Sequence, residues 1–480
     1  MKRATIIAVT TGFAFCIAMP LKATHVAAAE ILYECLGDDQ FLVTLNLYRD
    51  CAGNTLFDTQ LITVNNPCGG PQELIVYRVG IEEVSQLCPD ALSQSACSGG
   101  PYPGIERHTY TGVITLPRCD FIIFSWTLCC RNGAIDNIFA DVNETDIYIQ
   151  TTMYSQSFSC DNSPVFNSTP IPYLCVGYPA SYGFGTTESD GNELVYTFIE
   201  ALEAPGLPCV YLGGYTYTQP IPGMVLDPLT GQLTFTPPTI GNFVVTVLVS
   251  QYDAEGTLIG EVMRDMQFVV IACDNVPPDP ATGTVQNLSS GVVTTPYSVN
   301  ACDQEHFCFD FTIVDPDSGQ TVLLQSNVMD VMPGASFTWS GTNPVSGTIC
   351  WTVASVTDDV LSFQILASDN ACPVTAFSSY VYTVTVCPPP ELEIPNVFSP
   401  NSDGPNDAFY FIQFDGFVNY SMKIYNRWGM LIHETSTFTE DDLIWRPKPN
   451  VPDGTYYYVF DGETAKGEQV DRAGYFTLLR

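Results

Sequence analysis

The sequence predicts an all-β protein built from tandem immunoglobulin-like β-sandwich domains that end in a C-terminal β-sandwich. Strand-like apolar patterns recur along the chain, turn signals separate them, and no segment has the periodicity of a long amphipathic helix. The 12% aromatic content, 36 glycines and 35 prolines fit strands joined by tight turns. We expect about three domains over the 480 residues, since a domain averages roughly 150 residues.

The first 29 residues have the pattern of a secretory signal peptide. Lys2 and Arg3 precede an uncharged apolar run, and alanines at 27–29 suit cleavage before Glu30. A retained membrane anchor is the less favoured alternative. No later stretch reaches the roughly 18 to 20 apolar residues of a spanning helix. We therefore expect residues 1–29 to be removed and no transmembrane anchor to remain.

Three apolar runs are the clearest strand candidates. In residues 41–48 every second side chain is apolar, which predicts a strand with one buried face. Residues 243–249 are nearly all apolar, as in a strand buried on both faces. Residues 380–386 alternate again, and turn sequences such as 227–231 and 452–454 lie between these runs. Many short strands with such turns indicate β-sandwiches.

Composition places the domain boundaries near three proline-rich segments, at 162–172, 273–284 and 387–390. Residues 267–273 and 382–387 each form an apolar run that ends in a cysteine, which indicates a weak tandem repeat. The predicted parts are a signal peptide (1–29), a cysteine-rich β domain (30–158), an immunoglobulin-like or cadherin-like sandwich (159–275), an immunoglobulin-like sandwich with a proline-rich linker (276–390) and a C-terminal domain (391–480).

The 18 cysteines indicate disulfides formed in an oxidising compartment. No Cys-x-x-Cys spacing occurs, which argues against a zinc site. Loss of Cys16 with the signal peptide leaves an odd number, so at least one thiol is unpaired or intermolecular. We expect a Cys308–Cys350 bridge, because both residues lie in strand-like runs. For the adjacent Cys129 and Cys130 we favour two disulfides with different partners over a redox-active pair.

The chain is acidic because basic residues are scarce. It carries 16 Lys and Arg against 52 Asp and Glu, a net charge of −36, although only 14% of its residues are charged. Between Asn132 and Met422 the single base is Arg264, against 31 carboxylates. Nucleic-acid binding needs bases that displace counterions from phosphates, and an anionic membrane surface attracts bases too. The composition argues against both partners.

Four ordered motifs near the C-terminus carry a family resemblance. They lie at 394–407 (IPNVFSPNSDGPND), 424–429 (IYNRWG), 451–458 (VPDGTYYY) and 474–480 (GYFTLLR). This segment resembles the gliding motility-associated C-terminal domain, the type B sorting domain of type IX secretion in Bacteroidota-type bacteria. One departure is Trp445-Arg446-Pro447, where the family usually has Trp-Asp-Gly. The resemblance implies export through the periplasm to the outer cell surface, with the type IX secretion machinery as partner.

The upstream part resembles, less specifically, surface proteins of the same bacteria that carry polycystic-kidney-disease-type (PKD-type) or cadherin-like domains. The residues that carry this resemblance are 45–51, 128–132, 162–166, 227–231 and 264–268. Such proteins are mostly described as associated with gliding or adhesion. The resemblance therefore implies a location more than a chemical activity.

Calcium is the cofactor that the sequence favours most. Asn401, Asp403, Asn406 and Asp407 place four oxygen-bearing side chains around Gly404, and Ca²⁺ takes six to eight oxygen ligands. The alternative is a turn whose side chains bond to their own backbone. The same two interpretations apply to two weaker acidic turns, which resemble those of cadherin-like domains and lie at residues 188–193 and 315–317.

Catalysis has little support in the sequence. The mature chain has three histidines, His108, His306 and His433, and none lies in a known catalytic motif. The alternative to a non-enzyme is a secreted hydrolase such as a glycosidase, with catalytic carboxylates in 30–275. The adjacent acid pairs weighed for such carboxylates are Glu82-Glu83, Asp358-Asp359 and Asp441-Asp442.

We therefore expect an exported cell-surface protein of structural or adhesin-like function, associated with gliding or surface attachment. Its ligand is expected to be a surface glycan or a protein. Tyr211, Tyr215 and Tyr217 are candidates for stacking on sugar rings, against the alternative that they pack in the domain.

Overall fold

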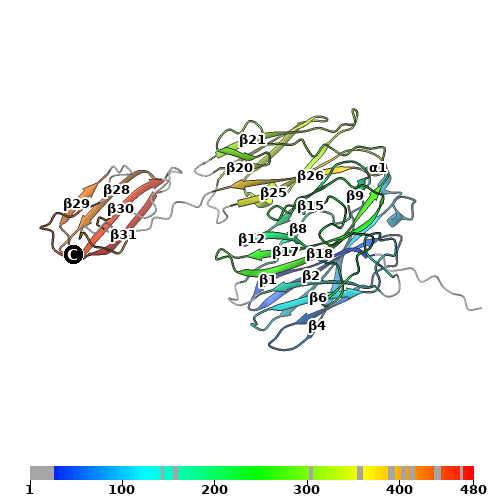
Figure 1. The fold of residues 1–480 in the computed structure, drawn as a ribbon, viewed down its shortest axis with the longest axis horizontal. Helices are drawn as coiled ribbons and strands as arrows, with labels where there is room; N and C mark the ends of the chain where they lie inside the picture. Colours follow the sequence, from blue (N-terminus) through cyan, green and yellow to red (C-terminus); the bar gives the residue numbers. More distant parts are fainter. Residues whose placement is uncertain are drawn as a thin grey trace, which may run out of the picture.

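The computed structural model describes residues 26–480 except 142–144, 155–159, 302–305, 354–359, 387–394, 402–406, 410–416, 437–444 and 465–468. The described chain is nearly all β, as predicted, and its helices are single turns: α1 (Pro89–Leu92), η1 (Ala96–Ser98) and α2 (Val328–Val331). Within these residues no helix has the length and apolarity needed to cross a membrane. Figure 1 shows the C-terminal sheet apart from the larger body formed by the other sheets.

The N-terminal strands form a sheet that closes on itself. They are β1 (Val26–Gly37), β2 (Gln40–Asp50), β3 (Thr59–Asn65), β4 (Gln72–Glu83), β5 (Ile105–Thr115), β6 (Ile122–Leu128) and β7 (Ile147–Met153). Their order is β1-β2-β5-β4-β3-β6-β7, and β18 (Leu258–Ile271) pairs with both end strands, β1 and β7. The alternating pattern predicted for 41–48 is confirmed in β2, because Phe41, Val43, Leu45 and Leu47 all face the core inside this ring.

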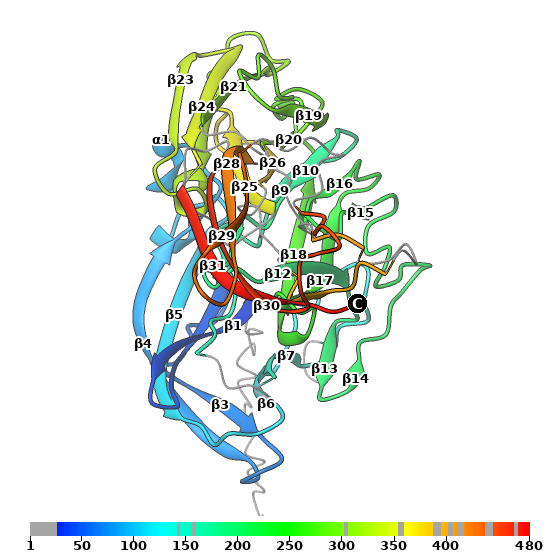
Figure 2. The same cartoon turned by 90° about the vertical axis from the view of Figure 1, so that its left-hand side faces the viewer.

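The second sandwich shares β18 with that ring. β18 pairs with β17 (Gly241–Tyr252), which pairs with β12 (Glu193–Phe198), and β9 (Tyr173–Cys175) adds to β18. The prediction for 243–249 is confirmed, since β17 is buried on both faces. A separate three-stranded sheet has the order β10 (Ala180–Tyr182), β16 (Leu233–Phe235) and β15 (Val225–Leu226). In Figure 2, β4 and β5 lie on one side of β17 and β18, and this three-stranded sheet lies on the other. The remaining short strands are β8 (Val165–Phe166), β11 (Thr186–Thr187), β13 (Leu202–Ala204) and β14 (Leu207–Pro208).

The sheet arrangement bears on two predicted boundaries. The expected division near residue 158 does not separate two sheets, because a single 13-stranded sheet runs through both predicted domains. The reason is that β1 pairs with β18, more than 200 residues later in the chain. The expected cleavage point before Glu30 lies inside β1, where residues 26–29 are buried, and the cleavage itself stays a prediction.

Residues 285–386 form a two-sheet sandwich around one core. One sheet has the order β19 (Val292–Thr295), β20 (Ser298–Asn300), β26 (Phe377–Thr385), β25 (Val360–Ser368) and β22 (Leu323–Ser326). The other has β21 (His306–Ile313), β24 (Val345–Thr352) and β23 (Ser336–Gly341). The predicted alternation of 380–386 is confirmed, with Tyr380, Tyr382 and Val384 in the core.

The C-terminal sheet has the order β27 (Val397–Phe398), β31 (Gln469–Leu478), β30 (Gly454–Thr464), β28 (Phe417–Tyr425) and β29 (Leu431–Thr435). Its core is mainly aromatic, with Phe409, Trp445 and Phe476 among its buried residues. Trp445, beside the departure from the family motif, exchanges two backbone hydrogen bonds with Phe409.

The same closing arrangement occurs in the second, third and C-terminal sheets. In each, a short early strand runs parallel to the last long strand: β9 beside β18, β20 beside β26 and β27 beside β31. Antiparallel hairpins do not produce such a pair, since parallel neighbours need a crossover connection. The weak tandem repeat in the sequence thus corresponds to a repeated way of closing a sandwich.

Disulfides cross-link the larger body at several levels. The predicted Cys308–Cys350 bridge is confirmed, and it joins directly opposite residues of β21 and β24. The prediction for Cys129 and Cys130 is wrong: the two sulfurs are bonded to each other, and every other described cysteine except Cys209 is paired elsewhere. Cys209 is free and buried. The other bridges are Cys35–Cys160, Cys51–Cys97, Cys68–Cys119, Cys88–Cys372 and Cys175–Cys273.

Two adjacent charged residues of β18 are buried, and the first, Arg264, pairs with β1. Arg264 lies directly across the ladder from Glu30, with Nε and Oε2 2.8 Å apart and side-chain exposures of 0% and 1%. Its Nη2 donates to the Ser168 carbonyl at 2.6 Å, and its guanidinium lies 4.5 Å from the ring centre of Phe166. The only base between Asn132 and Met422 is thus used inside the protein.

Asp265 makes the second buried pair, on the opposite face of β18, since successive strand residues point to opposite sides. Arg131 donates to its two carboxylate oxygens at 2.9 and 2.8 Å, and the Thr246 hydroxyl donates to the same group at 3.2 Å. Because an unpaired buried charge is strongly unfavourable, β1, β18 and the segment after β6 have to fold together.

Replacing Arg264 with Met should strongly destabilise the larger body, because Glu30 would remain buried without its charge partner. Breaking a buried pair in this way costs about 3–5 kcal/mol, measurable by urea denaturation of the full chain. Arg118→Met is the matched control, since the exposed Arg118 pairs with Asp39 and exposed pairs contribute about 0–1 kcal/mol. Equal losses in the two variants would contradict the assignment.

Candidate functional site

Three carboxylates from two separate turns converge in the second sandwich. Asp161 precedes β8, and Glu188 and Asp190 follow β11; one oxygen of each lies within 4.8 Å of the others. The pairing of β8 with β11 brings the two turns together. The Glu188 carboxylate accepts hydrogen bonds from the backbone N–H groups of Asp190 and Asn192, at 2.9 and 2.7 Å, which shapes the second turn.

Side-chain amides surround this carboxylate cluster (Asp161, Glu188, Asp190). Asn192 Nδ2 donates to Asp161 at 2.9 Å, and the backbone N–H of Asn162 donates to Asp190 at 2.7 Å. Gln251 is fully buried, and its Nε2 lies 3.3 Å from Asp161 Oδ1 and 3.2 Å from Glu188 Oε1. Its Oε1 has no hydrogen-bond partner in the described chain.

The cluster lacks positive charge. Burial, followed by the charges of Asp190 and Glu188, raises the pKa of Asp161 to about 7, and burial raises the pKa of Glu188. The nearest bases on either side along the sequence, Arg131 and Arg264, are already paired with Asp265 and Glu30. Carboxylate and amide oxygens are the ligands that Ca²⁺ takes, so the residue types present suit a divalent cation.

Sequence reasoning identified only part of this cluster. Residues 188–193 were singled out as an acidic turn, but Asp161 was missed, because it lies in a different turn 27 residues earlier. The strand pairing that joins the two turns leaves no local signal. For the stronger sequence candidate, Asn401 and Asp407 are described while Asp403 and Asn406 lie outside the described residues. Calcium at 401–407 therefore stays a prediction.

The third acidic turn belongs to another buried cluster, where the third sandwich meets the second. Asp315 Oδ1 accepts the backbone N–H of Asp317 at 2.8 Å, as in a self-satisfied turn. Asp315 Oδ2 is buried with no hydrogen-bond partner in the described chain. Burial, with the charges of Asp369 and Asp317, raises the pKa of Asp315 to about 6. Asn275, just after β18, donates to Asp369 at 2.7 Å.

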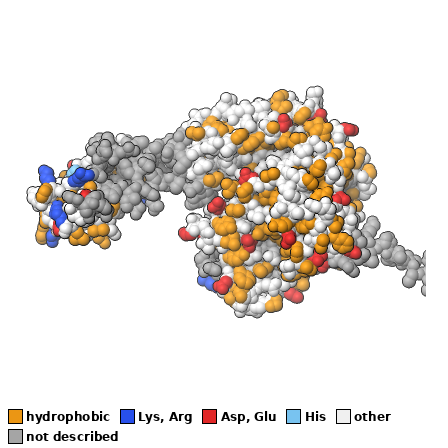
Figure 3. Space-filling view, in the orientation of Figure 1, with side chains coloured by type: hydrophobic (Ala, Val, Ile, Leu, Met, Phe, Trp, Pro, Cys, Tyr) orange, Lys and Arg blue, Asp and Glu red, His pale blue; other side chains and the backbone are white. Residues whose placement is uncertain are grey.

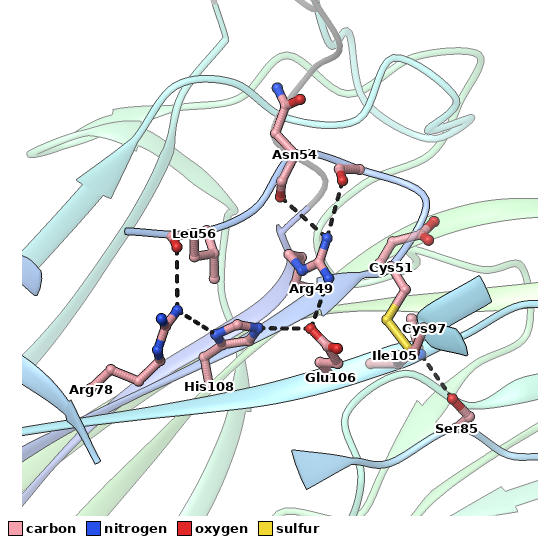
Figure 4. A network of polar contacts seen from close by, with 12 residues as sticks. Arg49, Cys51, Asn54, Leu56, Arg78, Ser85, Cys97, Ile105, Glu106 and His108 are labelled. Atoms are coloured by element: carbon pink, nitrogen blue, oxygen red, sulfur yellow. Dashed lines mark hydrogen bonds and ion pairs between the residues drawn. A yellow bond between two sulfur atoms is a disulfide. The ribbon is translucent and has the colours of Figure 1, made fainter. Parts of the chain in front are cut away.

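Figure 4 shows a third polar network, inside the closed ring. Arg78 donates to His108 Nδ1 at 3.4 Å, and His108 Nε2 lies 3.0 Å from Glu106, which also accepts from Arg49 at 2.7 Å. Since Arg only donates, Nδ1 accepts and Nε2 carries the proton of a neutral imidazole. Burial lowers the pKa of His108. Both ring nitrogens are occupied, so His108 has a structural role and is not positioned as a catalytic base.

The remaining sequence candidates do not assemble into a site. The backbone N–H of Ala201 donates to the Tyr211 hydroxyl at 3.2 Å, and the Tyr215 ring centre lies 5.8 Å from that of Phe243. Of the three tyrosines only Tyr217 is exposed. Glu82 and Glu83 are exposed on β4, where Glu82 pairs with Arg107. The acid pairs at 358–359 and 441–442 lie outside the described residues.

The family comparison bears on the C-terminal sheet. Residues 392–478 match the CHU_C type IX secretion signal domain. The C-terminal segment is a type IX secretion signal domain. This confirms the resemblance of the four C-terminal motifs, which lie within or next to these residues. The signal domain accounts for sorting to the cell surface by type IX secretion. A comparison with curated proteins gives no match.

Solved structures of low similarity are multidomain immunoglobulin and cadherin proteins. A titin I67–I69 fragment is 16% identical and covers 66% of this chain and 99% of that chain, with a TM-score of 0.19. The mouse nectin-like molecule 4 ectodomain is 11% identical and covers 65% of this chain and 97% of that chain, with a TM-score of 0.24. Drosophila N-cadherin EC1-4 is 9% identical and covers 88% of this chain and 92% of that chain, with a TM-score of 0.18.

The His108 network predicts an acid-sensitive contribution to stability. Because the folded-state pKa of His108 is lowered from its ordinary 6.5, the unfolded chain takes up the proton first, and stability falls as the pH drops below that value. We expect the difference in melting temperature between the native chain and His108→Gln to shrink as the pH falls from about 7.5 to about 5.5.

The matched control for this measurement is His306→Gln, at an exposed histidine of β21. Its melting temperature should stay close to that of the native chain throughout. A difference for His108→Gln that stays constant over the same pH range would show that the imidazole contributes no proton-linked stability.

Proposed function

We propose that the protein is a structural or adhesive component of the outer cell surface. The type IX secretion signal domain at 392–478 is the observation that carries the proposal, since it gives an address to the all-β body that precedes it. Gliding or attachment of the cell to a surface is the process in which we place it.

The disulfides support an extracellular destination. The described chain contains seven, and they are spread over the ring, the second sandwich and the third sandwich. Such bridges form and persist in oxidising compartments. Cys88–Cys372 is the most telling of them, because it joins the ring to the third sandwich across 284 residues of sequence. A body cross-linked in this way suits a structural protein outside the cell.

The signal domain presents a different surface from the body. From Lys423 onward there are seven bases against nine acids, and Figure 3 shows Lys and Arg side chains gathered on this domain. Trp428 is 84% exposed at the tip of a turn in which Asn426 accepts the backbone N–H groups of Trp428 and Met430. Exposed Trp is a common anchor of protein interfaces, so this turn supports recognition by the secretion machinery.

The carboxylates favour this proposal over a secreted hydrolase. The two carboxyl groups of a glycosidase stand roughly 5–10 Å apart on either side of the substrate. In the carboxylate cluster, the surrounding amides and backbone N–H groups already bond to the carboxylate oxygens. The cluster is also absent from the lining of the large cavity described below.

We further propose that the carboxylate cluster binds Ca²⁺. The three carboxylates, each with an oxygen within 4.8 Å of the others, support a missing positive charge at this point. A cation here would join the turn before β8 to the turn after β11. The proposal concerns stability and makes no claim on catalysis.

Deleting residues 391–480 should abolish surface display while the rest of the chain accumulates inside the cell envelope. The measurement is protease accessibility and antibody labelling of intact cells. The control is a chain of full length with Arg118→Met, which leaves the signal domain untouched. Unchanged display of the truncated chain would overturn the assigned export route.

Calcium should raise the melting temperature of the full chain. A ligand at 100 times its Kd stabilises a protein by about 2.7 kcal/mol. Asp190→Asn should remove most of this shift, whereas Asp227→Asn should keep it, since the exposed Asp227 only bonds to its own turn. No calcium-dependent shift, or equal shifts in both variants, would contradict the site.

A further inference from the structure

A cavity of about 520 Å³ lies where the ring, the second sandwich and the third sandwich meet. One wall is the segment after β4, residues 84–87. The second sandwich contributes 167–172 and 182–185, and the third contributes residues of β22, α2, β25 and β26. The volume is within the roughly 300–1,000 Å³ of small-molecule sites, which often lie at domain junctions.

The walls of this junction cavity are held together by covalent and hydrogen bonds. Cys88–Cys372 joins the ring to the third sandwich, and the Cys88 backbone N–H donates to the Pro373 carbonyl at 3.0 Å. Gln86 donates to the carbonyls of Thr375 and Tyr173, at 2.5 and 3.1 Å, and so touches both sandwiches. Because these bonds fix the walls before a ligand binds, the walls lose little conformational entropy on binding.

The lining residues select against charged anions. Among the described residues no Lys, Arg or His lines the cavity, and Asp330 is the only carboxylate in this lining. A phosphate, sulfate or carboxylate would therefore enter without a counter-charge, which is unfavourable. The polar lining consists instead of side-chain amides and hydroxyls, and each amide offers both donors and acceptors.

The lining is also divided into an apolar part and a polar part. Ile171, Tyr182 and Phe377 belong to or pack against the core of the second sandwich and form the apolar part. The amides of Gln325 and Gln364 belong to the polar part. Gln364 Oε1 accepts from the Ser168 hydroxyl at 3.1 Å, while the side chains of Gln325 and Thr169 make no hydrogen bond to a described residue.

We propose that the junction cavity binds a neutral saccharide. Sugar hydroxyls donate and accept hydrogen bonds, as do the lining amides, and the C–H face of a sugar ring can lie on the apolar part. This inference rests on the proposed surface function, to which it gives a ligand class. The site binds without cleaving, because glycoside hydrolysis uses a pair of carboxylates and the lining provides one.

An extended peptide is the competing ligand. It would add to the free edge of β22, the last strand of its sheet. β22 has only four residues, so few main-chain pairs would form, whereas side-chain amides surround the cavity. The lining therefore favours the saccharide.

The test uses the full chain on an array of neutral oligosaccharides, with sialylated and sulfated oligosaccharides and unstructured peptides as further arms. Thr169→Trp places a large side chain at the cavity wall and should abolish neutral-saccharide binding. Leu229→Trp, at an exposed position outside the lining, should leave binding unchanged. Gln325→Ala should weaken binding about fivefold, the loss of about one hydrogen bond, and Leu323→Ala on the same strand should not.

Several outcomes would overturn the proposal. The first is that the native chain binds no neutral saccharide, and the second is that Thr169→Trp leaves neutral-saccharide binding intact. The third is that the native chain prefers anionic oligosaccharides or peptides and that Thr169→Trp removes this binding. Surface display of the same variants is measured separately on intact cells. A native chain that is displayed but binds no neutral saccharide refutes the cavity assignment alone, and a native chain that binds but is not displayed refutes the export proposal alone.

Discussion

The larger body depends on β18 and its two adjacent buried charges. Arg264 faces one core, where it pairs with Glu30 of β1, and Asp265 faces the other, where it pairs with Arg131. Each of these charged side chains is unfavourable to bury unless the side chain that pairs with it is in place. The ring and the second sandwich consequently share one strand and one folding requirement, and neither set of contacts is complete without the other.

This shared strand places the candidate sites. The turn that holds Asp161 follows the ring, the turn that holds Glu188 and Asp190 precedes β12, and β17 supplies Gln251 from beside β18. The junction cavity borders the core of the second sandwich, since Ile171 and Tyr182 belong to both. The Cys88–Cys372 bridge holds the third sandwich beside it. Both sites therefore lie at places where distant segments of the chain meet.

The local features of the fold were predictable from the sequence. Period-two and fully apolar runs placed β2, β17 and β26, because side-chain burial follows strand geometry directly. The ring closure, and with it the absence of a sheet boundary near 158, was not predictable, since it rests on pairing such as Glu30 with Arg264. That pairing leaves no periodic signal, as with Asp161 and its two partners. The bond between Cys129 and Cys130 was missed because separate partners were assumed for adjacent cysteines.

The Cys88–Cys372 bridge has a topological consequence for export. Once it forms, residues 88 to 372 are a closed covalent loop with the termini outside it. A chain in this state does not pass through a narrow channel as one extended thread, because at least two segments must enter side by side. If oxidation precedes the outer-membrane step, the route has to admit a compact body; if the route admits only a thread, oxidation has to wait until the far side.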